Sequence, residues 1–589
     1  MNIEFEVIKK FRKYFLVIIY TFDFMKTLLY VLIACINIPQ LTTAQLINNP
    51  PHSPLKIPLI LAGNFGELRT GHFHAGIDIK TYHREGLSVL SIDQGYVSRI
   101  KISTSGYGKA LYVTHPNGLT SVYAHLQKFA PEIEAYIKKL QYEKRSFTLE
   151  TFLKPHQFPV LKGQLIAYSG NTGGSTAPHL HFELRESSNS QPQNPLLFNI
   201  DIKDTNAPVL QKLYAYPLEG TAVVNKSKLK VQIPFSRQRD GSLLATTIRA
   251  KGKIGLGIKA YDRQDLAANH NGLYMIETKR NDNVLMRMRF NHFSFEDSKH
   301  INSLMDYNHL VRFRERIMYL FKKEYNSLSL YEKIIDNGEI TVNPSTKDTL
   351  VIQLLDAASN KTKIIVPIEY DEREAVLKKE PHKDGILIDP SKEYSYNFSS
   401  VNVTLKKNTF YEQEEIAINY QNEQLELHPT NRYINNPIRI AFDINSIEPK
   451  LRKYSYIGIK NNKDSYDFIA STQKNESLVA SIKNMGTYQI RYDSVPPSIR
   501  AKNFKEGAPL NYYKKLIVEI TDLESGINSY EAYLNDQWIL MEYEPKDKTL
   551  TYNFDDKIAG DNNSYDLRVI VKDQLNNSKE FHAHFKKKN

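Results

Sequence analysis

The chain has 589 residues, an ordinary apolar content, a formal net charge of +12 at pH 7 and a single cysteine, Cys35. This length exceeds what one hydrophobic core accommodates and predicts about three to five domains. The basic balance favours an anionic environment such as a cell-envelope polymer or a membrane surface. The chain has neither a Gly-Lys-Ser/Thr phosphate loop nor an RNP-like strand, which argues against nucleic acid. With one cysteine no intrachain disulfide can form, so any metal site should use His, Asp or Glu.

Residues 1–44 have the pattern of an export leader. Two apolar runs, 14–22 and 27–38, are each shorter than the ~20 residues of a transmembrane helix, and small residues typical of a cleavage site follow the second run. Met25 is an alternative start. The residues that end in Cys35 resemble a lipobox. Lipidation of Cys35 is the only one of these alternatives in which the protein would have a membrane as a partner. Every alternative predicts export.

Short strands and tight turns dominate residues 45–203, which we predict to be one compact all-β domain. Pro116-Asn117-Gly118 between two β-rich runs indicates a hairpin turn. Apolar residues at helical spacing in Pro131–Glu143 predict a helix, inserted between strands within about residues 129–158.

The remaining chain continues to alternate between strand-like runs and turns, with a weak internal repeat. Two segments each open with an Asp that is followed within four residues by a proline. Each continues with a strand that runs into a second Asp, and closes on a third Asp that has an Asn four residues later. The repeated positions are Asp204, Asp262, Asp356 and Asn360 in the first segment and Asp493, Asp522, Asp573 and Asn577 in the second. This pattern predicts immunoglobulin-like β-sandwiches at 204–370 and 493–589, with a β-sandwich of unclear type at 371–492.

Histidines concentrate in the first predicted domain and form three clusters. The first holds His74 and Asp78, the second is Tyr-Ala-His125-Leu, and the third is His179-Leu-His181. On a strand, His179 and His181 point to the same face. His74 and Asp78 would lie ~13 Å apart on a straight strand, so a bend between them, at Gly76, is needed to bring both to one cation.

These residue types suit a hydrolytic metal site. Catalytic zinc takes about three protein ligands and keeps a position open for water, and two histidines with one carboxylate leave the zinc a strong Lewis acid. Two further histidines could transfer protons near neutral pH. The alternative for any His-x-His is a solvated strand face, which is our interpretation of His582-Ala-His584.

Taken in order, the three clusters resemble the lysostaphin/LytM-type zinc endopeptidases of peptidoglycan. The shared pattern is His-x-x-x-Asp, then Tyr-x-His-Leu, then Gly-Asn-Thr-Gly-x-Ser-x-x-Pro-His-Leu-His-Phe-Glu, and it spans roughly residues 60–200. The resemblance implies zinc as cofactor, with His74, Asp78 and His181 as ligands, and His125 and His179 as catalytic histidines. Ala177 departs mildly from the pattern, and the helical insert lengthens one connection.

The resemblance implies an exported zinc metalloendopeptidase that hydrolyses peptide cross-links of peptidoglycan, in the periplasm or cell envelope of a Gram-negative bacterium, with an extracellular location as the alternative. The predicted fold class is all-β and multidomain, with a β-rich peptidase domain followed by about three β-sandwich domains that could bind the wall or envelope proteins. An alternative from a different class is a non-catalytic envelope scaffold or regulator of other wall hydrolases. Retention of all five polar positions does not favour this alternative.

Overall fold

The computed structural model describes residues 50–376, 385–509, 513–554 and 564–586. Residues His52–Asn589 form one compact unit. The predicted leader, with Met25 and Cys35, lies outside the described residues. Within the described ranges, none of the helices combines the length and the apolar character that a membrane span requires.

The N-terminal region, residues 52–203, is built on a nine-stranded sheet in the order β1-β2-β11-β6-β5-β4-β8, with β12 paired to β11 and β9 to β4; β3-β10-β7 form a second, three-stranded sheet. Its strands are β1 (Leu61–Gly63), β2 (Ile77–Lys80), β3 (Ser88–Leu90), β4 (Gly95–Ile102), β5 (Lys109–Thr114), β6 (Leu119–Ala124), β7 (Lys128–Phe129), β8 (Leu149–Phe152), β9 (Pro159–Val160), β10 (Leu165–Tyr168), β11 (His179–Glu186) and β12 (Pro192–Gln193), with the helix α3 (Pro131–Lys144) and the 3-10 turn η1 (Pro195–Leu197).

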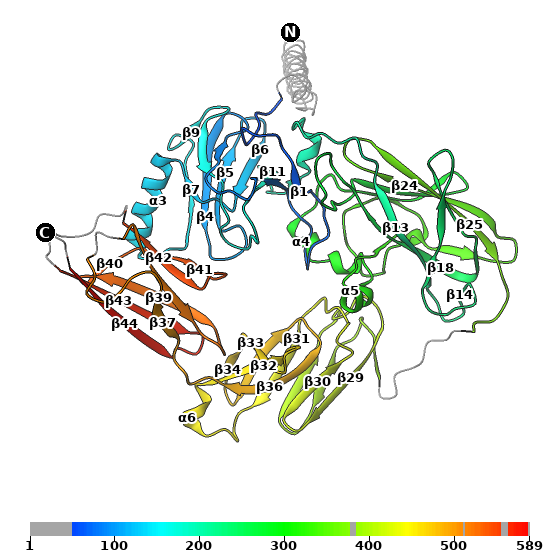
Figure 1. Cartoon of the computed structure of the whole chain (residues 1–589). Coiled ribbons are helices and arrows are strands. Elements are labelled where there is room, and N and C mark those ends of the chain that lie inside the picture. Colours follow the sequence, from blue (N-terminus) through cyan, green and yellow to red (C-terminus); the bar gives the residue numbers. More distant parts are fainter. Residues whose placement is uncertain (1–49, 377–384, 510–512, 555–563, 587–589) are drawn as a thin grey trace, which may run out of the picture. The chain divides into compact units, whose positions relative to one another are not determined.

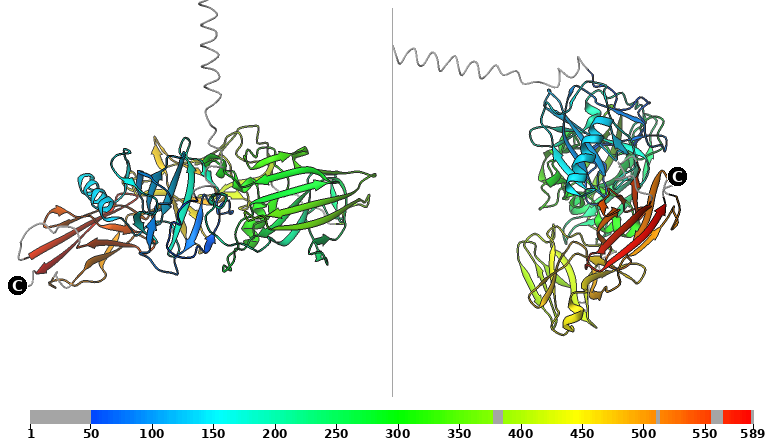
Figure 2. Two further views of the ribbon diagram at one scale, coloured as in Figure 1. Left: turned by 90° about the horizontal axis from the view of Figure 1, so that it is seen from above. Right: turned by 90° about the vertical axis from the view of Figure 1, so that its left-hand side faces the viewer.

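Helix α3 confirms the predicted helical segment and is seen in cyan beside the strands of this region in Figures 1 and 2. Pro131 opens it, where the missing N–H is harmless, and Arg145 in the left-handed region closes it. Ile133 and Ile137 are buried in the core of the region. The rest of the predicted insert is not helical, because β8 pairs with β4 and extends the main sheet.

Residues 209–370 form a thirteen-stranded sheet assembly around the long strand β18. Its strands are β13 (Val209–Pro217), β14 (Val223–Val224), β15 (Val231–Ile233), β16 (Phe235–Arg237), β17 (Leu243–Ala245), β18 (Ile248–Tyr261), β19 (Met275–Arg280), β20 (Asn283–Arg289), β21 (Met318–Tyr319), β22 (Tyr331–Ile334), β23 (Ile340–Val342), β24 (Lys347–Leu355) and β25 (Lys361–Tyr370), with α4 (Phe295–Ser298), α5 (Tyr307–Phe313), η2 (Ile301–Ser303) and η3 (Asp336–Gly338).

Two further sandwiches follow, one of six-stranded and five-stranded sheets and one of two four-stranded sheets. The first contains β26 (Ile386–Ile388), β27 (Tyr394–Asn397), β28 (Val401–Leu405), β29 (Glu414–Gln421), β30 (Gln424–His428), β31 (Ile438–Asp443), α6 (Pro449–Arg452), β32 (Ser455–Lys460), β33 (Tyr466–Ile469), β34 (Thr472–Lys474), β35 (Ser477–Ile482) and β36 (Gly486–Tyr492). The second contains β37 (Ser498–Ala501), β38 (Lys515–Thr521), β39 (Ile527–Leu534), β40 (Gln537–Trp538), β41 (Glu542–Glu544), β42 (Thr549–Asn553), β43 (Ser564–Asp573) and β44 (Ser578–Lys586).

The predicted all-β, multidomain fold class is confirmed by these sheets. The boundaries of the predicted domains at 203/204, 370/371 and 492/493 stay predictions. Each set of sheets has its own hydrophobic core, and the 52–203 region also shares buried residues with two others. Leu540 of the last sandwich is buried in the core of residues 52–203. Phe65 and Phe73, near the site described next, are buried in the same cluster as Phe290 and Phe293 of the 209–370 region.

Candidate metal centre

Strand register brings the three predicted ligands together. β2 and β11 pair antiparallel with Asp78 directly opposite His181. Both side chains lie on one face of the sheet, because Ile77, Leu180 and Phe182, their neighbours in sequence, belong to the hydrophobic core. A slip of one residue in this register would separate the two ligands.

His74 reaches the same point from the loop before β2, and Gly76 makes the approach possible. A Cβ atom at Gly76 would lie 2.2 Å from the Phe182 carbonyl oxygen and 2.7 Å from Glu183 Cγ. Only a glycine therefore lets the loop cross β11 this closely. This is the bend that the sequence required between His74 and Asp78.

The three donor atoms converge on a small volume. His74 Nε2 lies 3.1 Å from His181 Nδ1 and 3.1 Å from Asp78 Oδ1, and His181 Nδ1 lies 2.9 Å from the same oxygen. Tetrahedral zinc ligands at 2.0–2.1 Å from the metal are about 3.3 Å apart, so these spacings suit zinc closely. The three residues are 2–5% exposed.

Hydrogen bonds on the far side of each ring direct lone pairs inward. His74 Nδ1 is 2.7 Å from the Asn64 carbonyl oxygen, to which it donates, so its Nε2 carries no proton when the ring is neutral. His181 Nε2 donates to Glu183 Oε1 at 2.8 Å, which leaves Nδ1 bare in the neutral ring. Two nitrogen lone pairs and the Asp78 carboxylate thus face each other, an arrangement that a cation stabilises.

The charges nearby agree with a site for a cation. Burial would lower the pKa of His181, but hydrogen bonds to the Asp78 and Glu183 carboxylates outweigh it and raise that pKa to about 9. Burial would raise the pKa of Asp78, and His74, His179 and His181 around it instead hold it well below its usual range. The pocket therefore attracts positive charge.

The other two predicted histidines flank this centre. His125 follows β6, the neighbour of β11, and its ring centroid is 4.8 Å from that of His179 and 5.8 Å from that of His181. His179 Nε2 lies 3.4 Å from Asp78 Oδ1. All five predicted site residues are thus gathered in one place.

His125 and His179 are also held by their Nδ1 atoms. His125 Nδ1 donates to the Thr172 carbonyl at 2.8 Å, and His179 Nδ1 donates to the Ala177 carbonyl at 2.8 Å. Burial, together with nearby His181 and His179, lowers the pKa of His125 to about 3, so this ring is neutral at pH 7. A neutral imidazole with a bare Nε2 can accept a proton.

An open pocket of about 670 Å³ gives access to the centre, and Asp78, His125 and His179 line it together with Arg69. Arg69 Nη2 donates to Asp78 Oδ2 at 2.5 Å, so the carboxylate is held on one oxygen by Arg69 and offers the other to the histidines. From sequence alone Arg69 could not be told from an ordinary surface ion pair.

Three supporting groups were missed by the sequence analysis. Asn64 and Thr172 act through backbone carbonyls, which no side-chain pattern reveals. Glu183, fully buried, could have been found, because it stands in the quoted motif and alternates with His181 on the same face of β11. His115 directly precedes the predicted hairpin turn, a position for which we expect an exposed side chain, but it is 4% exposed and hydrogen-bonds to Gln94 and Ser121, so this expectation is wrong.

A protein-family profile matches this region of the chain. Residues 72–142 and 138–195 match the profile of peptidase family M23. A DD-carboxypeptidase/endopeptidase Mpg of Neisseria meningitidis is 33% identical over 129 residues, which cover 22% of this chain and 23% of that protein. Lysostaphin of Staphylococcus simulans is 30% identical over 131 residues, 22% of each chain. The chain therefore matches less than a quarter of the length of these relatives.

Among solved structures, the catalytic domain of the antimicrobial peptidase lysostaphin from Staphylococcus simulans aligns at 25% identity. The alignment covers 27% of this chain and 96% of that one, with a TM-score of 0.18. The resemblance to lysostaphin/LytM-type peptidases that the three motifs predict is confirmed by the sequence matches, and the matched part of the chain, residues 72–195, corresponds to peptidase family M23.

Proposed function

We propose that the chain is an exported zinc metalloendopeptidase that hydrolyses peptide cross-links of peptidoglycan in the envelope of a Gram-negative bacterium. The observation that carries the proposal is the convergence of His74 Nε2, His181 Nδ1 and Asp78 Oδ1 within 3.1 Å of one another, next to an open pocket that Asp78 lines. The similarity to a DD-carboxypeptidase/endopeptidase and to lysostaphin supports the substrate class.

In this proposal His74, Asp78 and His181 hold the zinc. A zinc ion there supplies Lewis acidity, which polarises a carbonyl and acidifies water. The hydrogen bonds of His74 to Asn64 and of His181 to Glu183 fix which nitrogen of each ring faces the metal.

His125 and His179 perform the proton transfers. The bare Nε2 of neutral His125 can take a proton from the attacking water and later release it to the leaving amine. His179, whose Nδ1 is held by Ala177 and Ser175, presents its Nε2 to the same space. Once this nitrogen has taken up a proton, it can donate a hydrogen bond that stabilises negative charge on the reacting carbonyl oxygen. The two histidines can exchange these two roles in this scheme.

The test is digestion of purified peptidoglycan by the full chain, with fragments identified by mass. We expect release of peptide fragments that a zinc chelator abolishes and added zinc restores, and loss of that release in His181→Ala. His582→Ala is the matched control, since His582 also belongs to a His-x-His pair but is 68% exposed in its side chain and far from the site in sequence.

Two results would contradict the proposal. One is fragment release that persists in His181→Ala and in the presence of the chelator. The other is no release at all by a folded protein that binds zinc and peptidoglycan, which would favour the alternative of an envelope scaffold or regulator.

A further inference from the structure

A second group of converging ligand atoms lies outside the peptidase site, at one end of the 209–370 sheets. It consists of Asp204, Asp262 and Asp356, each of which offers one carboxylate oxygen within 4.8 Å of those offered by the other two. Asp262 and Asp356 are each 1% exposed. We propose that these three carboxylates bind a calcium ion.

The carboxylates have no cationic partner. Among the residues that the structure describes, no lysine or arginine forms an ion pair with Asp204, Asp262, Asp356 or the adjacent Asp265. Burial, together with Asp204 and Asp356, raises the pKa of Asp262 to about 8. A folded protein can keep buried carboxylates close together when a cation binds between them and offsets their mutual repulsion.

A second observation does not depend on the charge of the cluster: two buried side-chain oxygens at this site have no hydrogen-bond partner within the described part of the chain. Asp262 Oδ1 is buried and accepts no hydrogen bond, and the same is true of Asn271 Oδ1, whose residue is 2% exposed and pairs through its backbone with Asp262. Buried oxygens without a donor are costly, and native structures satisfy nearly all of them. A cation would satisfy the Asp262 oxygen.

The internal repeat provides a contrast. Asp493, Asp522 and Asp573 occupy the equivalent positions in the second copy. There Ser525 donates hydrogen bonds from its N–H and its hydroxyl to Asp493 Oδ2, so this carboxylate oxygen has protein partners. In the first copy Asp265 stands three residues after Asp262, as Ser525 stands three after Asp522, but its carboxylate accepts hydrogen bonds from Thr205 and Asn206 and supplies no donor to the cluster. Of the six repeated aspartates, only Asp262 therefore keeps a buried carboxylate oxygen without a hydrogen-bond partner among the described residues.

The chemical type of the available ligand atoms indicates which metal ion would bind. All available ligand atoms are oxygens, with no imidazole or thiolate, which suits hard cations rather than zinc. The site combines several carboxylates with loop residues, and calcium tolerates such irregular coordination by six to eight oxygens, whereas magnesium requires near-octahedral geometry.

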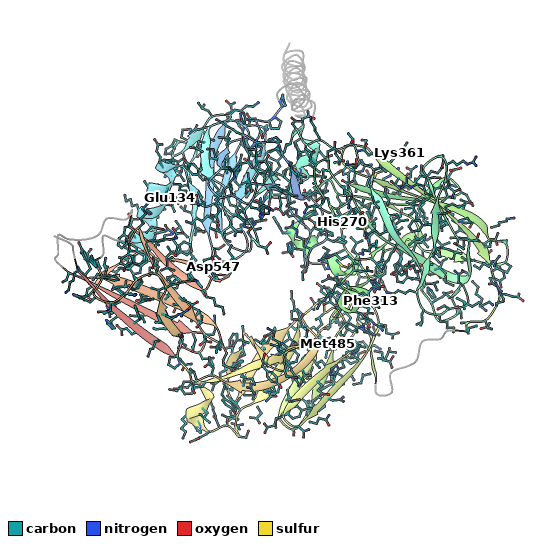
Figure 3. The ribbon with its side chains drawn as sticks, viewed as in Figure 1. Glu134, His270, Phe313, Lys361, Met485 and Asp547 are labelled. Carbon is teal, nitrogen blue, oxygen red and sulfur yellow. The ribbon has the colours of Figure 1, made fainter. Side chains whose placement is uncertain are left out.

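The position of the site connects it to the peptidase pocket. Asp262 begins the loop 262–274 between β18 and β19, which includes His270, labelled in Figure 3. Leu266 and Asn269 of this loop line the pocket, and Asn269 donates to the Ala62 carbonyl at 3.1 Å. Calcium at the base of the loop would hold this wall of the pocket in place.

The same loop supports a predicted zinc ligand. Asn64 exchanges two hydrogen bonds with the backbone of Gly272, at 2.7 and 2.8 Å, and its own carbonyl accepts the hydrogen bond from His74 Nδ1. An effect of calcium on hydrolysis rests on the proposed function, whereas calcium binding itself does not.

Calorimetric titration of CaCl₂ into the full chain, in buffer freed of divalent ions, tests the proposal. We expect one site per chain with a Kd of ~1 mM or tighter, as in extracellular calcium modules, and weaker binding of MgCl₂. Asp262→Asn should weaken calcium binding at least tenfold, and Asp522→Asn, the matched control in the second copy, should leave it unchanged.

Thermal unfolding supplies a second readout that does not depend on activity. Calcium should raise the Tm of the wild type. At a pH above about 8, where the raised pKa of Asp262 leaves its carboxylate charged, Asp262→Asn should raise the Tm in the absence of calcium because it removes a repelling charge. The same substitution should abolish the calcium-dependent increase.

Three outcomes would overturn the proposal: no calcium binding up to about 5 mM, unchanged affinity in Asp262→Asn, or loss of binding in Asp522→Asn instead. A wild-type Tm that rises on acidification but not with calcium would show that Asp204 and Asp262 share a proton rather than a metal ion. Calcium binding without peptidoglycan hydrolysis would uphold this inference while contradicting the proposed function.

Discussion

Each of the four histidines around Asp78 has one ring nitrogen engaged in a hydrogen bond to the surrounding protein, and these bonds separate two pairs. His74 and His181 are turned so that their free nitrogens meet at Asp78 Oδ1. His125 and His179 are turned so that their free nitrogens face the same space from the pocket side. The pairs should therefore respond differently to substitution.

At the residue scale we predict that different histidine substitutions separate the loss of metal binding from the loss of catalysis. His125→Ala should retain bound zinc and lower kcat by about 10²–10⁴-fold, the range for loss of a proton-transfer group. His74→Ala should lose the zinc itself, because one of three protein ligands is removed. Metal analysis of the purified variants, alongside kcat, distinguishes the two effects. Loss of zinc in His125→Ala would contradict the assignment.

At the scale of elements, the site depends on how β2, β6 and β11 pair. β11 lies between the other two, and its alternation puts His179, His181 and Glu183 on the pocket face and Leu180, Phe182 and Leu184 in the core. The buried face thus fixes the register that aligns the ligands. The loop that delivers His74 must cross β11 at Gly76, where no side chain fits.

Gly76→Ala should therefore disrupt the centre without touching a ligand. The added methyl group meets the Phe182 carbonyl at 2.2 Å, so β11 or the His74 loop must move. We expect weaker zinc binding and a loss of about 1–3 kcal/mol in the free energy of unfolding, typical of overpacking. Gly220→Ala is the control, because a Cβ there meets no atom within 4 Å. Equal zinc affinity in both variants would refute this account.

At the scale of the whole molecule, the 52–203 region shares core with the 209–370 region. Phe73 contacts Phe290 and Phe293 with ring centroids 6.1 and 5.3 Å apart, and Phe65 stacks on Phe293 at 4.8 Å. All four rings are at most 1% exposed. Phe73 and Phe65 flank the loop that carries His74, so the sandwich region stabilises the part of the chain that completes the centre.

Phe293→Ala should accordingly destabilise the molecule by about 3–5 kcal/mol, the usual cost of removing a buried aromatic ring. Because Phe293 packs on the residues next to His74, zinc affinity should fall as well. Phe152→Ala removes a ring from the same molecule that is 73% exposed and should have a small effect. Denaturant unfolding and zinc titration measure both quantities, and unchanged zinc affinity in Phe293→Ala would show that the shared core does not support the centre.

Much of the candidate site was predictable from sequence because its ligands are few, chemically distinctive and closely spaced. His179 and His181 share a face by the two-residue period of a strand, and the pattern of three clusters predicted the same set that the structure gathers at Asp78. Alternation of apolar and polar residues likewise predicted strands nearly throughout, with one helix in the first region.

The order of amino acids is enough to establish the chemistry of the site: which residue types are available, the face on which each strand residue lies, and the resemblance to a peptidase family. Which of these residues contact one another depends on the folded arrangement of the chain. It placed Asp78 opposite His181, supplied the Asn64 and Thr172 carbonyls that orient the rings, and joined Asp204, Asp262 and Asp356 from positions up to 152 residues apart in sequence. The physical reason is that side-chain direction follows from local backbone geometry, whereas strand register and contacts between distant loops depend on how the buried faces pack.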